Sequence, residues 1–250
     1  MRRAAALLAA GLVATGCGGS SSSSHPALIV SAASSLRNAF ADYADTFKAA
    51  TVRLSFGGSD ELAAQIRQGV KPDVYAAANT KLPDQLYAEG RVDKPVVFTA
   101  NRLVLAVPAK STTVHSLADL TKPNVAIAIG AASVPVGSYT RKVLAGLPAV
   151  QQRAIMANVR SEEPDVAGIV GKLTQGAVKA GFVYVTDVVA AKGALRAIAL
   201  PAALQPKVVY EAAVVRGAAH PAQARAFVDG LRTGAGQADL RRAGFLPLPR

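Results

Sequence analysis

Four loops carry small or hydroxyl-bearing residues immediately before a predicted helix, at positions 31–35, 56–60, 132–137 and 163–165. Such a loop presents unpaired backbone N–H groups and the positive end of the helix dipole. Together these bind an anion without any charged side chain. The alternative is that Ser35, Ser59 and Asp165 are ordinary N-caps that satisfy only their own helices. The spacing leaves both interpretations open.

Signals of catalysis are weak in this sequence. Segment 57–61 resembles the start of a nucleophile elbow, but Glu61 occupies the position where that motif requires its second glycine. Segment 171–174 lacks P-loop spacing, because Val166 stands at the first glycine and Leu173 separates the lysine from the threonine. We therefore expect no enzyme.

The residues that most often hold metal ions are scarce. The chain has one cysteine and three histidines, which are His25, His115 and His220. One cysteine cannot build a disulfide framework or a Cys-cluster site, and no histidine has a partner at helical i, i+4 spacing. We expect each histidine to be solvated or to cap a loop, and we expect neither a bound metal cation nor a cofactor.

The composition is that of a folded, basic protein. Hydrophobic residues make up 51% and charged residues 18% of the chain, which is typical of a protein with a buried core. The length of 250 residues suits one large domain or two small ones. The formal net charge is +12, two units of which belong to Arg2 and Arg3. This charge favours an anionic partner: a small anion, a lipid surface or a nucleic acid. The basic residues have outward-facing helical spacing without interleaved aromatic residues, so we expect no nucleic-acid binding.

The N-terminal segment predicts export and a lipid anchor. Residues 1–16 combine a charged start, a short apolar run and small residues before Cys17, which resembles a bacterial lipoprotein signal peptide. Residues 17–26 include five consecutive serines and predict a flexible tether behind a lipidated Cys17. Because Ala14 is smaller than the residue usual there, a secreted protein with one unpaired cysteine is the alternative. Either way we expect an extracytoplasmic protein, anchored to the cell membrane or free in the periplasm.

Short apolar runs alternate with amphipathic stretches after residue 27. The expected strands span 28–30, 52–56, 73–77, 103–107, 125–129, 181–185 and 208–215. The expected helices span 36–50, 61–68, 81–89, 139–147, 151–157, 166–179 and 221–232. Strands that alternate with helices form βαβ units, so the predicted fold class is α/β, with parallel sheets flanked by helices.

Several segments, taken in order from residue 28 to residue 245, resemble the periplasmic molybdate-binding proteins of ABC importers. The most specific motifs are Val-Pro-Val-Gly-Ser-Tyr at 134–139 and Val-Tyr-Val-Thr-Asp at 183–187. The supporting motifs lie at 30–36, 55–59, 62–66, 72–75, 101–105, 209–214 and 242–245. The resemblance rests on the whole set, because no single motif is decisive.

This resemblance implies a type II periplasmic-binding-protein fold. The fold has two lobes, each a mainly parallel sheet flanked by helices, joined by two hinge crossovers. We expect lobe I to comprise residues 27–107 and 207–250, and lobe II to comprise residues 108–206. In this family the oxyanion lies between the lobes.

The resemblance also implies which residues hold the anion: Ser35, Ser59, Val136, Val166 and Tyr184. The serines contribute hydroxyl and backbone N–H groups, the valines contribute backbone N–H groups, and the tyrosine contributes its hydroxyl. Tyr184 lies outside the four loops and, by itself, is more typical of a core position. Ser34 stands where alanine is common, so it shares or shifts the role of Ser35. We expect the carboxylate of Asp60 to point away from the anion.

The predicted function is capture of molybdate, and also of tungstate, by a monomer that delivers it to the permease of an ABC importer. A site made only of donors rejects protonated anions such as hydrogen phosphate. One alternative is a receptor for sulfate, iron or an organic anion, although the adjacent tyrosines common in iron receptors are absent. The other is a secreted serine hydrolase that uses Ser59 or Ser35, for which no credible His–Asp pair is present.

Overall fold

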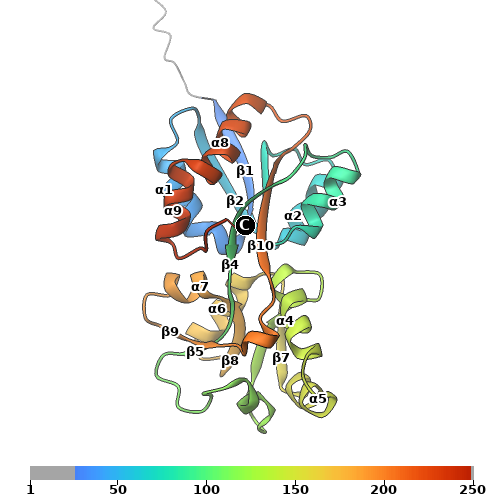
Figure 1. Ribbon diagram of the computed structural model, residues 1–250, viewed down its shortest axis with the longest axis vertical. Coiled ribbons are helices and arrows are strands. Elements are labelled where there is room, and N and C mark those ends of the chain that lie inside the picture. The colour runs from blue at the N-terminus through green and yellow to red at the C-terminus, as the bar shows by residue number, and fades with distance from the viewer. Residues whose placement is uncertain (1–25, 249–250) are drawn as a thin grey trace, which may run out of the picture.

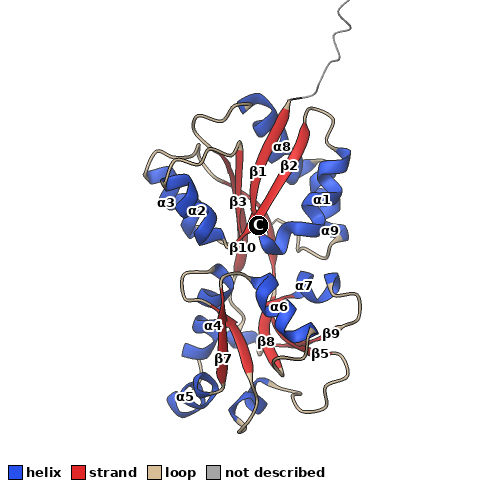
Figure 2. Ribbon diagram, turned by 180° about the vertical axis from the view of Figure 1, so that it is seen from behind, coloured by secondary structure: helices blue, strands red, loops and turns tan. Residues whose placement is uncertain are grey.

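The computed structural model describes residues 26–248, which form two lobes stacked along the long axis of the molecule (Figure 1). Each lobe holds one five-stranded sheet, in the order β2-β1-β3-β10-β4 in lobe I and β7-β6-β8-β5-β9 in lobe II. Helices flank both sheets, so the α/β fold class is confirmed (Figure 2). The predicted signal peptide, Cys17 and all of the tether except Pro26 lie outside the described residues.

Lobe I is built from both ends of the described chain. Its strands are β1 (Ala27–Ala33), β2 (Thr51–Gly57), β3 (Val74–Ala77), β4 (Val96–Asn101) and β10 (Val208–Val214). Its helices are η1 (Ser34–Leu36), α1 (Arg37–Thr46), α2 (Ser59–Arg67), α3 (Lys81–Ala88), α8 (Pro221–Thr233) and α9 (Ala235–Arg242). Helices α2 and α3 lie on one side of the sheet, and α1, α8 and α9 lie on the other (Figure 2).

Lobe II is built from the middle of the chain. Its strands are β5 (Leu103–Pro108), β6 (Ile127–Gly130), β7 (Val159–Glu163), β8 (Ala180–Tyr184) and β9 (Leu195–Ala199). Its helices are η2 (Leu117–Thr121), α4 (Pro135–Ala145), α5 (Ala149–Ala157), α6 (Val166–Thr174), α7 (Val185–Ala190) and η3 (Ala202–Leu204). The central strand β8 is buried along its whole length, as is β10 in lobe I, which accounts for their continuous apolar runs.

Both sheets are mixed but mainly parallel, as expected, because four of the five strands in each sheet run in the same direction. Strand β1 is parallel to β2 and β3, and β6 is parallel to β7 and β8. Strands β10 and β5 are antiparallel to both of their neighbours. These two strands directly follow the crossings between lobes, so they run away from the junction while the other strands run toward it.

The first crossing lies at Arg102, between β4 and β5, and not after residue 107 as expected. Strand β5 enters the second sheet at Leu103, which pairs with Tyr184, so residues 103–107 belong to lobe II. A buried strand has the same apolar pattern in either sheet, which is why the sequence did not indicate the correct lobe. The chain returns to lobe I through residues 200–207.

The sequence patterns do not predict strands β4, β7 and β9 or helices α7 and α9. Strands β7 and β9 lie at the edges of their sheet, and polar or half-buried residues interrupt them. Helix α7 begins directly after β8, where one apolar run spans the strand end and the helix start. Strands at a sheet edge, and a helix that follows a strand without a loop, lack the periodic apolar pattern from which such elements are predicted.

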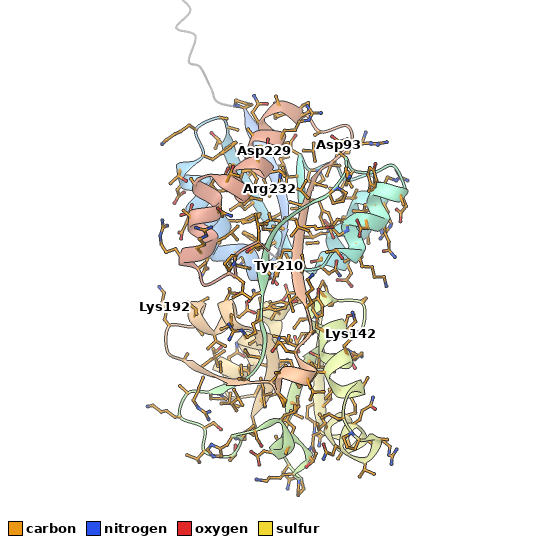
Figure 3. The ribbon with its side chains drawn as sticks, viewed as in Figure 1. Asp93, Lys142, Lys192, Tyr210, Asp229 and Arg232 are labelled. Carbon is orange, nitrogen blue, oxygen red and sulfur yellow. The ribbon has the colours of Figure 1, made fainter. Side chains whose placement is uncertain are left out.

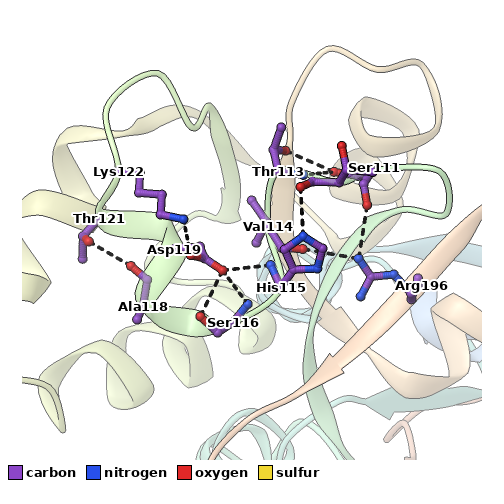
Figure 4. A network of polar contacts seen from close by, with 11 residues as sticks. Ser111, Thr113, Val114, His115, Ser116, Ala118, Asp119, Thr121, Lys122 and Arg196 are labelled. Atoms are coloured by element: carbon purple, nitrogen blue, oxygen red, sulfur yellow. Dashed lines mark hydrogen bonds and ion pairs between the residues drawn. The ribbon is translucent and has the colours of Figure 1, made fainter.

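A polar loop far from the lobe junction accounts for His115 (Figure 4). The Asp119 carboxylate pairs with Lys122 at 2.6 Å and accepts hydrogen bonds from the backbone N–H groups of His115 and Ser116, both at 2.9 Å. These contacts, with that to Lys122 the largest, hold the pKa of Asp119 well below its usual value. The His115 ring Nε2 lies 2.9 Å from the carbonyl oxygen of Thr112, so this histidine is part of the loop, as expected.

His220 occupies a capping position in lobe I. It is the N-cap residue of α8, and its backbone N–H donates to Asp73 Oδ1 at 2.8 Å. Within residues 26–248, no three or more His, Cys, Asp or Glu side chains gather closely enough to hold a metal ion. The same residues include no helix with the length and apolar character needed to span a bilayer.

Candidate functional site

The junction between the lobes is where eight strands end. Strands β1 to β4 and β6 to β9 all run toward it, because only the crossing strands β5 and β10 run away. Helices α2, α4 and α6 begin there, shortly after β2, β6 and β7 end. In α/β folds, ligands bind at the carboxyl ends of strands, so the topology gathers the four loops at one place.

One cavity at this junction is lined by all five residues expected to hold the anion. It encloses about 200 Å³, including its opening to solvent. Lobe I contributes Ser34, Ser35 and Ser59, and lobe II contributes Val136, Asp165, Val166 and Tyr184. The structure therefore brings Ser35 and Tyr184 together, which are 149 positions apart in the chain.

A backbone N–H determines the direction in which the Ser59 hydroxyl can donate its hydrogen bond. Its Oγ accepts a hydrogen bond from the N–H of Ala78 at 3.1 Å, and Tyr75 Oη donates to its carbonyl oxygen at 2.7 Å. Because the N–H of Ala78 can only donate, the hydroxyl hydrogen of Ser59 is left for another acceptor. Gly58 is the N-cap of α2, so the capping interpretation is wrong for Ser59.

Ser35 is also not a helix cap. It lies inside η1, and its Oγ is 2.9 Å from Oη of Tyr210 in β10. Ser34 lines the same cavity and is buried. The Ser35 hydroxyl is therefore held by a strand that the chain reaches only after it has built lobe II.

Helices α4 and α6 begin against the cavity. Helix α4 has no side-chain cap and starts with Pro135, so the N–H groups of Val136 and Gly137 have no acceptor within the helix. Asp165 caps α6, as the capping alternative predicts, since its Oδ1 accepts from Gly168 N at 2.9 Å. The N–H of Val166 precedes that bond and has no acceptor within the helix. Both helices therefore offer backbone donors to a ligand.

Tyr184 has a buried hydroxyl that nothing in the described chain satisfies. The residue ends β8, is 1% exposed and lines the cavity. Its Oη has no hydrogen-bond partner among residues 26–248. Burial raises the pKa of Tyr184 well above its ordinary value, so the hydroxyl keeps its proton and can donate. A buried hydroxyl without a hydrogen-bond partner lowers the stability of the folded protein by about 1–3 kcal/mol. A ligand that accepts a hydrogen bond from it would remove this penalty.

In the part of the chain that the structure describes, the cavity is lined by helix N-termini and not by cationic side chains. None of the described lining residues is a lysine, an arginine or a histidine. Three helix N-termini point their positive ends at the junction, each equivalent to roughly half an elementary charge. The carboxylate of Asp165 also lines the cavity, but it is engaged by its own helix. The arrangement suits a small anion that is held by neutral donors.

Two carboxylates lie close to these loops. Asp60 is not among the residues that line the cavity, but its Oδ1 is buried without a hydrogen-bond partner among the described residues. The first turn of α2 provides the positive dipole end that favours this position. Asp187 in α7 accepts a hydrogen bond from Tyr184 N at 2.8 Å, and burial raises its pKa from 3.8 to about 7. At neutral pH this carboxyl is therefore partly protonated.

The backbones of the two lobes lie close together at Gly58. A Cβ atom at this position would lie 2.4 Å from the carbonyl oxygen of Pro164 in lobe II. The backbone of Gly58 has φ −62° and ψ 135°, a conformation that any residue adopts. Glycine is thus required by the contact between lobes and not by the turn.

A larger open groove adjoins the cavity and shares Ser34 and Ser35 with it. Its lining includes charged residues from both lobes, namely Arg37, Asp42, Asp187, Lys192 and Arg242. Figure 3 shows Lys192 at the edge of lobe II near the junction, and Tyr210 at the junction itself. Cationic side chains therefore lie outside the small cavity, along the groove that leads past it.

The sequence patterns do not reveal three residues that shape this site: Gly58, Asn101 and Tyr210. Asn101 ends β4, and its Nδ2 lies 3.4 Å from Tyr210 Oη. Both residues occur in motifs of the resemblance, but only as parts of apolar strands. In each apolar strand one polar side chain stands out, but the sequence does not indicate which residue it contacts.

Comparison with known proteins identifies the family. The sequence model described as bacterial extracellular solute-binding protein matches residues 28–246. Molybdate-binding protein ModA of Mycobacterium tuberculosis (strain ATCC 25618 / H37Rv) is 35% identical over 254 residues, covering 96% of this chain and 94% of that protein. Molybdate-binding protein ModA of Escherichia coli (strain K12) is 31% identical over 235 residues, covering 87% and 88%.

A solved structure has the same fold. The periplasmic molybdate-binding protein of Azotobacter vinelandii aligns with a TM-score of 0.79 and 23% identity, over 89% of this chain and 100% of that one. These relatives are substrate-binding proteins and not enzymes, which removes the serine hydrolase alternative. The two-lobed chain described here belongs to the family of bacterial extracellular solute-binding proteins, within which ModA proteins are its relatives.

Proposed function

We propose that this protein binds molybdate between its lobes, outside the cytoplasm, and delivers it to the permease of an ABC importer. The names of its relatives support the ligand, and the gathering of neutral donors around one small cavity carries the proposal. Tungstate has the same charge and nearly the same size as molybdate, so the proposal includes it.

The proposed ligand residues are Ser35, Ser59, Val136, Val166 and Tyr184. The hydroxyl and N–H of each serine, the N–H of each valine and the tyrosine hydroxyl make about seven donors. A buried dianion must have each oxygen hydrogen-bonded, because desolvation otherwise prevents binding. Hydrogen bonds to a charged ligand contribute roughly 1.5–3 kcal/mol each, so seven donors, less an association and ordering cost of several kcal/mol, are compatible with a Kd between about micromolar and nanomolar.

Closure of the lobes is part of the proposed mechanism. Residues 26–101 and 208–248 would move as one body and residues 103–199 as the other, about hinges at Arg102 and at 200–207. The contact between Gly58 and Pro164 supports a closed state in which the rim of the cavity is shut. A permease can then distinguish a loaded from an empty receptor by the lobe angle.

The proposed setting is the outer side of a cell membrane. Lipidation of Cys17 would hold a monomer near its permease, on the tether formed by the residues before Pro26. Two or more acyl chains are enough for stable anchoring. Mass spectrometry of the mature protein tests this part, because a diacylglyceryl mass on Cys17 supports it and an unmodified thiol contradicts it.

Isothermal titration calorimetry of the purified protein tests the proposed ligand. Molybdate and tungstate are expected to bind with similar affinity, and at least about 100-fold more tightly than sulfate or hydrogen phosphate. Sulfate has shorter bonds and cannot reach all donors at once, whereas hydrogen phosphate carries a proton with no acceptor. Tighter binding of sulfate or hydrogen phosphate than of molybdate would overturn the proposal.

A further inference from the structure

A chain of hydrogen bonds connects the backbone at the first crossing to Ser35. The N–H of Arg102 donates to Asn101 Oδ1 at 2.8 Å. Asn101 Nδ2 lies 2.9 Å from Thr186 Oγ1 and 3.4 Å from Tyr210 Oη. Tyr210 Oη lies 2.9 Å from Ser35 Oγ. The chain thus joins β4, β10 and η1 in lobe I, and through Thr186 it also contacts α7 in lobe II.

The first member of this chain fixes the orientation of the Asn101 amide group. A backbone N–H can only donate, so Asn101 Oδ1 accepts and the amide orientation is fixed. The NH₂ group of Asn101 then faces Tyr210 and donates to its oxygen. With its oxygen facing Asn101, Tyr210 can donate its hydrogen to Ser35 Oγ, and the Ser35 hydrogen can then point to the cavity.

The surroundings of Tyr210 hold its hydroxyl in place. The side chain is fully buried, and its ring makes edge contacts with Phe98, Tyr184 and Phe245 at centroid distances of 6.2, 5.9 and 5.4 Å. Burial also raises the pKa of Tyr210 well above its ordinary value, so the hydroxyl stays protonated. Tyr210 therefore has one ring position and one hydrogen to donate.

We propose that Tyr210 and Asn101 are positioning residues that lock the Ser35 hydroxyl as a donor, and that they thereby select oxyanions without a proton over oxyanions that carry one. This inference rests on the proposed function. Ser59 reaches the same polarity directly, because the N–H of Ala78 occupies its oxygen. The hydroxyls of Ser35 and Ser59 both accept from the protein and donate to the ligand, so a ligand O–H meets no acceptor at either of them.

Sulfate and hydrogen phosphate at pH 8 are the probes that isolate this effect. They share the same charge and a similar size, and they differ by one proton. The readout is the ratio of their affinities, measured by displacement of molybdate. A variant that merely loosens the lobe weakens both anions together, whereas a change in the polarity of Ser35 changes the ratio.

The first variant, Tyr210→Phe, frees the Ser35 hydroxyl to turn and accept. Affinity for molybdate is expected to fall about 5- to 20-fold, and the preference for sulfate over hydrogen phosphate is expected to shrink toward one. The matched control is Tyr43→Phe, a buried lobe I tyrosine whose Oη donates to the Phe227 carbonyl at 3.2 Å, away from the cavity. Tyr43→Phe is expected to lower Tm without changing the affinity for molybdate or the ratio of the sulfate and hydrogen phosphate affinities.

The second variant, Asn101→Asp, keeps the shape of the side chain and reverses the direction of the hydrogen bonds between position 101, Tyr210 and Ser35. The new carboxylate still accepts from Arg102 N–H but now also accepts from Tyr210, so Ser35 must donate to Tyr210 and turn its lone pairs to the cavity. All dianions bind more weakly because of the added charge, but hydrogen phosphate is expected to lose several-fold less affinity than sulfate. In a Ser35→Ala background, Tyr210→Phe is expected to have no further effect on the ratio.

The outcomes separate this inference from the proposed function. If the unmodified protein does not bind molybdate, the proposed function fails. If it binds molybdate but Tyr210→Phe behaves like Tyr43→Phe, or weakens sulfate and hydrogen phosphate equally, the positioning role is overturned. A shrunken ratio in Tyr210→Phe and a shift toward hydrogen phosphate in Asn101→Asp support it.

Discussion

The two lobes prepare for a ligand in opposite ways. In lobe I, the hydroxyl oxygens of Ser59 and Ser35 already have protein partners, which are Ala78 N and Tyr210 Oη. In lobe II, Tyr184 Oη has no partner within residues 26–248, and α4 begins without a side-chain cap. The serine hydroxyls of lobe I are therefore bonded before a ligand arrives, whereas lobe II keeps buried donors unpaired.

This contrast indicates how each lobe would respond to substitution. Removing a hydroxyl from lobe I breaks an existing bond, so stability and affinity fall together. Removing the Tyr184 hydroxyl from lobe II removes an unpaired group, so stability and affinity move in opposite directions. The predictions below go from the largest expected effect to the smallest.

The largest effect is expected where the two lobes touch. In Gly58→Ala the new methyl group meets the Pro164 carbonyl and holds the lobes apart, so molybdate affinity should fall about 100-fold. Calorimetry measures the loss. The control is Gly171→Ala, because a Cβ there meets nothing within 4 Å. Equal affinities for the two variants would contradict the closed contact.

Ser59→Ala should weaken molybdate binding roughly 30-fold and also lower Tm, because the N–H of Ala78 loses its acceptor. Calorimetry and thermal melting of the empty protein check the two effects. A loss of affinity with unchanged Tm would mean that Ser59 is not bonded to the protein before the ligand binds.

Asp187→Asn tests the buried carboxyl beside Tyr184. A pKa raised from 3.8 to about 7 means that the folded protein holds this proton more tightly than the unfolded chain. The free energy of unfolding of the unmodified protein therefore falls as pH rises toward 7. The amide of the variant does not titrate, so the variant should lack about 2 kcal/mol of the fall between pH 5 and pH 7. Urea titrations at both pH values measure the difference.

The control for this prediction lies in lobe I. Burial also raises the pKa of Glu211 to about 7. Glu211 therefore contributes equally to the pH dependence of the free energy of unfolding in the unmodified protein and in Asp187→Asn, and its contribution cancels when the two are compared. Identical pH dependence of the unmodified protein and Asp187→Asn would show that Asp187 ionises normally in the folded state.

Tyr184→Phe should separate affinity from stability. Molybdate affinity falls about tenfold, while the free energy of unfolding of the empty protein rises by about 1 kcal/mol because an unpaired buried hydroxyl is gone. Tyr75→Phe in lobe I is the matched comparison, since its hydroxyl is bonded to Ser59 O at 2.7 Å and its loss should destabilise. Destabilisation by both substitutions would remove the contrast between lobes.

The smallest effect on binding is expected from Val136→Ala. Only the backbone N–H of Val136 is a proposed ligand, so molybdate affinity should change by less than about threefold. Because the side chain is 1% exposed, Tm should nevertheless fall. Calorimetry and melting again check both, and a tenfold loss of affinity would mean that the side chain itself shapes the cavity.

Loop chemistry and apolar patterning were enough to predict the α/β class and the approximate place of the site. The loops that contain Ser35, Ser59 and Asp165 can be found from the sequence because strand ends and helix starts leave local signals. Asp165 proved to be a true cap, whereas Ser59 and Ser35 are bonded to Ala78, just after β3, and to Tyr210 in β10 instead. A local pattern cannot distinguish these cases, because the deciding partner is distant in sequence.

Other features depend on tertiary contacts that no local pattern carries. The prediction that residues 103–107 belong to lobe I is wrong, because an apolar run does not specify the sheet that it joins. Tyr210 is 175 positions from Ser35, and the need for glycine at position 58 comes from Pro164 in the other lobe. Chain topology, which brings such residues together, is the information that single segments lack.

A crystal structure of the protein grown with molybdate, with data collected at the molybdenum absorption edge, tests the central claim most directly. The account predicts one anomalous peak in the cavity, with its oxygens within hydrogen-bond distance of Ser35, Ser59, Val136, Val166 and Tyr184 and of no cationic side chain. A peak elsewhere, or an anion held by an arginine, a lysine or a metal ion, would contradict it.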